Sequence, residues 1–319
     1  MISQRAVDAI EASDTDELIR VVDGLCETGD WDGLAELKQR CAEAVTRAKQ
    51  VWGVEEHIRY RLALEAPGPW AGAAVSEGVA RFALGPLPEV AASTKTWAEL
   101  DRHLSDGPWR RVTAAERVVR GDDDVAEIED LPPALMAWEA YLLPTYKADK
   151  VETPSPTPPE VDEVELPESF EEITDPQSEG ALYDLVEPWV TQSNGRADMT
   201  TVQGTSLTAI RALGLTRARV GVLTAEEAIR WLGWAAASGG AHGHRRGAAA
   251  GRFGVWWLIA TLCDVTWPPD PEELSRCVES LRYQWFDDGS PGTGWALRLA
   301  MEDPRNRIAW AISAVDTAD

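Results

Sequence analysis

The chain has 319 residues, of which 44% are hydrophobic, so it can bury a sizeable core and is too apolar to be disordered throughout. It carries 54 acidic against 30 basic residues, a formal net charge of −24, and such a field repels nucleic acids and anionic membranes. We therefore expect no nucleic-acid ligand, no membrane contact and a preference for basic partners.

The N-terminus lacks the apolar core of a signal peptide, and the longest apolar stretch, residues 254–263, is too short to span a bilayer. The four cysteines (Cys26, Cys41, Cys263, Cys277) show no CxxC or short Cys/His spacing. Buried free thiols in a reducing cytosol are the expected state. The sequence thus predicts a soluble cytoplasmic protein with no metal site and no cofactor.

The N-terminal part is expected to be helical. Residues 13–29 combine a cap candidate, Ser13, with an apolar stripe at helical spacing and a stop at Gly29. Asp30 caps a second helix reaching towards Trp52, and the short linker makes the two an antiparallel hairpin. Further helices are expected over residues 54–65, 95–104 and 108–119, with turns and short helices over 66–88. We predict a helical N-terminal domain over residues 1–142.

Three adjacent carboxylates follow Gly121, at positions 122–124. Hard cations take oxygen ligands, but the stretch lacks the alternating spacing and the distal glutamate of a calcium loop. We therefore expect a solvated acidic turn.

The composition changes over residues 143–178, where prolines recur every few residues. Between residues 151 and 175 there are nine acidic residues and no basic one. Proline is excluded from helix and central-strand interiors, and dense like charges oppose collapse. We predict an extended inter-domain linker, partly polyproline II, whose recurring apolar residues let it lie along a surface groove.

A second, mainly helical domain is expected over residues 179–319. Two short strands, residues 197–203 and 218–223, flank a helix over 206–213 and could form a small parallel pair. Thr224 and Glu227 form a capping box that opens a helix over 225–237. Other helices are expected over residues 179–190, 272–286, 295–301 and 308–315. The predicted fold class is mainly α: an irregular helical two-domain protein with a small β element in the C-terminal half.

One stretch, residues 235–263, is a basic island in an acidic chain. It holds two histidines and three arginines: His242, His244, Arg245, Arg246 and Arg252. It also holds three glycines at intervals of four: Gly243, Gly247 and Gly251. On a helix this spacing leaves one face nearly free of side chains, so another backbone can approach closely.

Three interpretations of the basic segment stay open. Close helix packing explains the glycines and leaves the basic residues in solvent. Alternatively, a helix starting near His244 would place unpaired N–H groups beside Arg245 and Arg246, forming a site for phosphate or carboxylate. No Walker motif and no G-x-G-x-x-G after a strand accompanies it. A third hypothesis is a latch between these arginines and acidic residues 160–172.

Catalytic chemistry has little support. His242 or His244 could act as a general base and Ser238 or Cys263 as a nucleophile, but no spaced triad frames them. The catalytic residues are therefore unknown, and whether the chain catalyses a reaction stays open. Our leading hypothesis is a non-catalytic cytoplasmic interaction or scaffold protein with an acidic surface. The alternative is a small-anion or nucleotide-binding protein, with or without catalysis, that uses residues 242–252.

The stretches SGGAHGHRRGAAAGRFGVWW and WGVEEHIRYRLALEAPGPWAG resemble those of an uncharacterised actinobacterial protein family, a domain of unknown function. The resemblance covers most of the chain. It implies a bacterial cytoplasmic origin and assigns no activity, cofactor or catalytic residue to any position.

Overall fold

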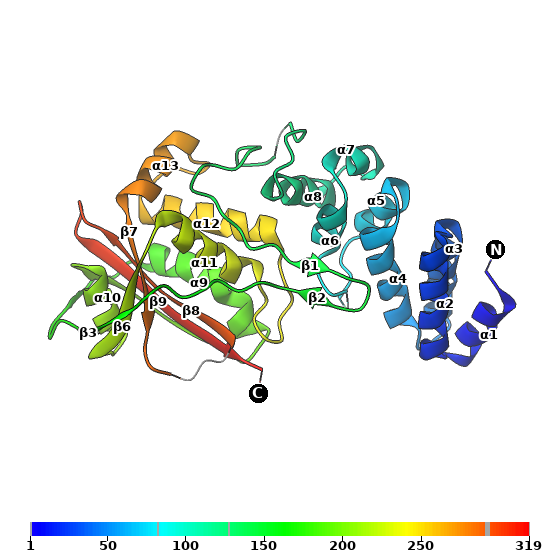
Figure 1. Ribbon diagram of the computed structural model, residues 1–319, viewed down its shortest axis with the longest axis horizontal. Helices are drawn as coiled ribbons and strands as arrows, with labels where there is room; N and C mark the ends of the chain where they lie inside the picture. Colours follow the sequence, from blue (N-terminus) through cyan, green and yellow to red (C-terminus); the bar gives the residue numbers. More distant parts are fainter. Residues whose placement is uncertain (1, 82, 127, 291–293, 319) are drawn as a thin grey trace. The chain divides into compact units, whose positions relative to one another are not determined.

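The computed structural model describes residues 2–81, 83–126, 128–290 and 294–318 (Figure 1). Helices make up 48% and strands 16% of the chain, and the C-terminal half contains a seven-stranded antiparallel sheet. The fold is therefore mixed α/β, and the prediction of a mainly α protein with a small β element was wrong in its proportion of sheet.

The chain divides into two compact units. Unit 1 comprises Met1–Ile128 and Pro144–Glu152, and unit 2 comprises Glu129–Leu143 and Thr153–Asp319. The segment predicted as a linker, residues 143–178, is thus shared: residues 144–152 belong to unit 1, and Leu143 and residues 153–178 belong to unit 2.

Unit 1 is a run of helices completed by a short antiparallel hairpin. The helices are α1 (Gln4–Ala12), α2 (Thr15–Thr28), α3 (Trp31–Thr46), α4 (Trp52–Glu65), α5 (Gly68–Ser76), α6 (Leu87–Thr94), α7 (Trp97–Leu100), the 3₁₀ turn η1 (Asp101–His103) and α8 (Pro108–Val119). The hairpin consists of β1 (Thr145–Tyr146) and β2 (Val151–Glu152). One apolar cluster fills the space among α1–α4, and a second lies among α4–α8 and includes Tyr146.

The caps of unit 1 follow the sequence signals with one correction. Asp30 caps α3 through its bond from the Gly33 N–H, and Gly29 ends α2 in the left-handed conformation, as predicted. Asp14, rather than Ser13, caps α2. Ser13 instead ends α1, a helix that the sequence analysis missed, with φ of 54°.

Unit 2 is built on the seven-stranded antiparallel sheet, whose order is β3-β6-β7-β8-β9-β5-β4. The strands are β3 (Asp162–Glu165), β4 (Glu171–Glu172), β5 (Arg196–Gln203), β6 (Arg217–Leu223), β7 (Arg282–Asp287), β8 (Gly294–Asp303) and β9 (Ile308–Thr317). The predicted strands 197–203 and 218–223 both exist, as β5 and β6. They are not a parallel pair, because β5 lies between β9 and β4 while β6 lies between β3 and β7.

Three predicted helices were wrong in whole or in part. Residues 295–301 and 308–315 lie in strands β8 and β9, and the helix predicted over 272–286 ends at Ser280, before β7. In β8, Leu297, Leu299 and Met301 join one core cluster while Ala300 joins the other. Because both faces of these strands are covered, their sequences are nearly continuous apolar runs, which do not distinguish strand from helix.

Helices cover the two faces of the sheet unequally. The helices of unit 2 are α9 (Pro176–Thr191), α10 (Ser206–Ala212), α11 (Ala225–Ala237), α12 (Ala248–Leu262) and α13 (Pro271–Ser280). Helices α9 and α11 pack directly on one face, and α12 packs over both as a further layer (Figure 1). The single helix α10 packs on the opposite face.

The acidic segment forms both outer strands of this sheet, β3 at one edge and β4 at the other. In a flat sheet these strands would lie about 29 Å apart at a spacing of about 4.8 Å. The connection between the two strands, residues 166–170, can span at most about 21 Å even when it is fully extended. The sheet is therefore curled so that its edges approach, and Leu166 of this connection packs in the cluster around α10. Residues 162–165 and 171–172 are thus strands of the sheet, joined by residues 166–170, and not a free linker.

Candidate functional site

The basic segment does not form the predicted helix terminus. Helix α12 begins at Ala248 rather than near His244, and Gly247 precedes it with φ of 101°. The side chains of His242 and His244 are exposed. Their backbone N–H groups donate to Ser193 Oγ and Gln192 Oε1, each at 3.2 Å, so this loop is held by the turn after α9.

The three arginines of the segment point to different surroundings. Arg246 donates from Nε to the Ala236 carbonyl at 2.7 Å and from Nη2 to the Leu185 carbonyl at 3.0 Å. Burial lowers the pKa of this guanidinium. Arg245 is half-buried and has its own interactions, whereas Arg252 is fully buried. The five predicted residues are therefore not brought together around one hollow.

Arg252 is the centre of a buried polar network in unit 2. Its Nε lies 2.7 Å from Glu139 Oε1 and its Nη2 lies 3.0 Å from Glu139 Oε2, a bidentate ion pair. The remaining donors reach the carbonyls of Pro132 and Ala134, both at 2.9 Å. Trp256 Nε1 and the Tyr141 hydroxyl also donate to Glu139 Oε1, each at 2.8 Å. The carboxylate partner of Arg252 is thus Glu139, and not the acidic residues 160–172 of the latch hypothesis.

Of the three glycines at intervals of four, only Gly251 lies in a helix, where it allows close packing of α12 against α11. A Cβ added there would lie 2.6 Å from the Gly233 carbonyl oxygen of α11. Gly233 in turn faces the Tyr141 ring, which an added Cβ would meet at 2.7 Å. These close approaches support the helix-packing interpretation at Gly251, whereas Gly243 and Gly247 lie before α12 and form no glycine face on a helix.

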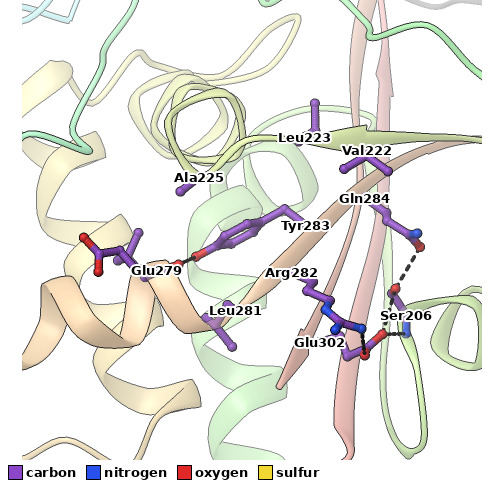
Figure 2. A pocket seen from close by; sticks show the side chains of 11 residues that line it. Ser206, Val222, Leu223, Ala225, Glu279, Leu281, Arg282, Tyr283, Gln284 and Glu302 are labelled. Carbon is purple, nitrogen blue, oxygen red and sulfur yellow. Dashed lines mark hydrogen bonds and ion pairs between the residues drawn. The ribbon is translucent and has the colours of Figure 1, made fainter. Parts of the chain in front are cut away.

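A hollow of about 430 Å³, the Ser206 pocket, lies where α10, α13 and strands β6–β8 meet (Figure 2). At its polar end the Ser206 hydroxyl lies 2.7 Å from Gln284 Oε1 and 3.3 Å from Glu302 Oε2. Glu302 also accepts from the Ser206 N–H at 3.0 Å and pairs with Arg282 at 3.3 Å. At its apolar end lie Leu223, Leu281 and the ring of Tyr283.

The polar groups of the Ser206 pocket mainly satisfy one another. The Tyr283 hydroxyl donates to the Val278 carbonyl at 3.0 Å, and burial raises its pKa. None of the four histidines lines the pocket, so Ser206 has no imidazole base beside it. The arrangement fixes the start of α10 on the sheet. No sequence pattern marks this cluster, because its members lie far apart in the chain.

A second hollow of about 460 Å³ lies between α9, α12 and the loop after α12. We call it the aromatic groove. Trp257 and Trp267 line it, and Asp184 and Asp264 bring carboxylates to it. Trp267 packs edge-to-face against Trp257 at 5.3 Å and against Phe253 at 5.1 Å between ring centroids. The groove is therefore lined by two indole rings, of which Trp257 is exposed and Trp267 half-buried, together with two exposed aspartates.

Among the described residues, no group of three or more His, Cys, Asp or Glu side chains could hold a metal ion. In the acidic turn after Gly121, Asp122 accepts from the Trp97 N–H at 2.5 Å and pairs with Arg117 Nε at 2.8 Å. Although burial acts in the opposite direction, these two contacts lower the pKa of Asp122. Asp122 is thus a structural contact of α7, while Asp123 and Asp124 are exposed.

These features define a class: a mixed α/β chain in which a helical unit precedes a unit built on a curled antiparallel sheet. A family model described as a family of unknown function (DUF6183) matches residues 16–318, and the chain belongs to this family. The resemblance to an uncharacterised family over most of the chain is thereby confirmed. No curated protein and no solved structure matches the chain. Within the described residues, no helix has the length and apolar character needed to cross a membrane.

Proposed function

We propose that the protein is a non-catalytic cytoplasmic interaction protein whose aromatic groove binds a basic segment of a partner protein. The observation that carries this proposal is the ring cluster Phe253–Trp267–Trp257, whose two tryptophans line the groove together with Asp184 and Asp264.

The exposed rings favour a binding surface over core packing. Phe253 and Trp257 are 44% and 37% exposed, and they lie four residues apart on one side of α12. Large aromatic side chains left in solvent beside a hollow are typical of interaction sites, where burying them supplies much of the binding energy.

The charge of the groove selects the partner. Asp184 and Asp264 are exposed, and the whole chain carries −24. A lysine or arginine side chain gains both a carboxylate contact and a cation–π contact with an indole ring. An adjacent apolar side chain of the partner would cover the remaining ring surface. A basic and apolar peptide segment therefore fits this groove better than an anionic ligand.

The groups that could have supplied catalysis have other roles. The Ser238 hydroxyl donates to the Ala235 carbonyl at 3.1 Å and accepts from Trp189 Nε1 at 2.8 Å. Burial raises the pKa of the Cys263 thiol, which disfavours its nucleophilic form. All four cysteines are free, a state that suits a reducing cytoplasm.

Binding of two fluorescein-labelled peptides tests the proposal: an eight-residue peptide alternating arginine with leucine, and its counterpart with glutamate for arginine. We expect fluorescence anisotropy to detect the basic peptide only. Trp257→Ala and Trp267→Ala should each weaken its binding by about tenfold or more. Trp52→Ala is the matched control, because Trp52 is 45% exposed on α4 of unit 1. Equal binding of both peptides, or full binding by both groove variants, would contradict the proposal.

A further inference from the structure

Cys263 and Cys277 form a close pair of half-buried thiols in unit 2. Cys263 is the C-cap of α12, and Cys277 lies near the end of α13. The two helices are in contact, both side chains pack against the same core cluster, and the two thiols are close enough to interact directly. Cys26 and Cys41, by contrast, are buried in unit 1.

The segment between the two cysteines supplies three residues of the aromatic groove, Asp264, Val265 and Trp267. Asp264 directly follows Cys263, and Trp267 lies three residues further along. The backbone of this segment is fastened at its start by the bond from the Val265 N–H to the Ala260 carbonyl at 2.8 Å. At its far end Asp270 caps α13. A covalent link between Cys263 and Cys277 would close the segment into a ring.

We infer that Cys263 and Cys277 are a dithiol modification site, which a low-molecular-weight disulfide converts into an intramolecular disulfide. One cysteine thiolate attacks the small disulfide, forms a mixed disulfide and releases one small thiolate. The second cysteine thiolate then attacks the cysteine sulfur of the mixed disulfide and releases the other. Two protein thiols are oxidised, one small disulfide is reduced to two thiols, and the two cysteine protons pass to the released thiolates.

The link restrains the groove loop. A disulfide between the ends of residues 264–276 removes conformational freedom from the chain between them. Trp267 and Asp264 then hold their positions beside α12 more tightly. The effect on partner binding rests on the function proposed above, whereas formation of the disulfide does not.

The surroundings of the Cys263 thiol determine the rate of this oxidation. Burial and the neighbouring Cys277 thiol raise the pKa of Cys263. Since the thiolate is the attacking species, oxidation should be slow at neutral pH and accelerate as the pH rises. A pair of this kind responds to sustained oxidation rather than to a brief pulse.

The test uses the full chain incubated with oxidised glutathione, followed by mass spectrometry of non-reduced peptides and by hydrogen–deuterium exchange. We expect a Cys263–Cys277 crosslinked peptide, its loss on adding reduced glutathione, and at least severalfold slower exchange over residues 264–276 in the oxidised protein. Cys263→Ser and Cys277→Ser should each stop at the mixed disulfide or remain unmodified. Cys41, which is buried in unit 1, serves as the internal control for unfolding.

Free thiols at both positions after prolonged oxidation at pH 8.5, or a crosslink with unchanged exchange over 264–276, would overturn the inference. Both measurements are made without any peptide ligand. Failure of the aromatic groove to bind the basic peptide would therefore leave the crosslink result intact, and the two proposals can fail separately.

Discussion

Glu139 and Arg252 form an ion pair in which both side chains are fully buried, with Nε and Oε1 2.7 Å apart. The pair joins residues 129–143, which precede the hairpin of unit 1, to helix α12 of unit 2. Every described oxygen and nitrogen contact of this pair lies within unit 2, so the network holds that segment on α12.

Breaking this pair should destabilise the protein strongly. Glu139→Leu leaves Arg252 charged and unpaired in a buried site, and we expect a loss of about 3–5 kcal/mol in unfolding free energy. The double variant Glu139→Leu/Arg252→Met should lose clearly less, because no unpaired charge remains. Urea unfolding followed by tryptophan fluorescence measures both. Arg230→Ala is the control, since its pair with Glu226 is exposed and should contribute a few tenths of a kcal/mol. Equal losses for the single and double variants would contradict this account.

Gly251→Ala should cost stability although alanine favours helices. The added Cβ would lie 2.6 Å from the Gly233 carbonyl oxygen, so α11 and α12 must separate, at a cost of about 1–3 kcal/mol. Gly24→Ala is the matched control in α2, because nothing lies within 4 Å of its added Cβ. That substitution should stabilise by up to about 1 kcal/mol. Thermal unfolding of the two variants should therefore shift in opposite directions.

Asp122 should stabilise unit 1 when its carboxyl group is ionised, and this stabilisation should be lost at acidic pH. Its folded-state pKa is lowered by the contacts with Trp97 and Arg117, so its contribution is present above the unfolded-state pKa and is lost as the pH falls through the folded value. Asp122→Asn should cost about 1–2 kcal/mol at pH 7 through the weakened contacts, and less at pH 3. Unfolding free energies between these pH values measure the effect. The same cost for exposed Asp123→Asn would argue against it.

The two carboxylates of the aromatic groove should govern the rate of association. Asp184→Asn/Asp264→Asn removes the charge that attracts a basic segment, so we expect a severalfold lower association rate for the arginine–leucine peptide and a weaker dependence on salt. Trp257→Ala should act mainly on the dissociation rate. Stopped-flow anisotropy separates the two rates. Asp8→Asn/Asp198→Asn, which removes the same charge from exposed positions elsewhere, should change neither rate appreciably.

The elements that the sequence predicted well are those whose signals are local. Asp30 and Thr224 cap their helices as expected because a cap depends on residues within one turn. The groove and the Ser206 pocket could not be predicted in this way. Trp267 reaches Phe253 through a turn of the loop, and Glu302 reaches Ser206 only when β8 pairs in its sheet register.

The burial of Arg252 shows why a cluster of basic residues in the sequence does not by itself predict a ligand site. Its basic neighbours and the glycine spacing suggested a ligand site, whereas a single carboxylate 113 residues away neutralises it. An arginine within an otherwise apolar helix, followed by Trp256, was the available signal for burial. Sequence position alone does not reveal which of many acidic residues meets it.

The outer strands of the curled sheet have a consequence for self-association. The two edge strands of the sheet expose carboxylates. These belong to Asp162, Glu163 and Glu165 in β3 and to Glu171 and Glu172 in β4. A second copy that added its own edge would bring like charges face to face, which opposes edge-to-edge pairing between molecules. The protection is electrostatic, so it should fade in acid, where neutralised edges would let copies join into extended sheets.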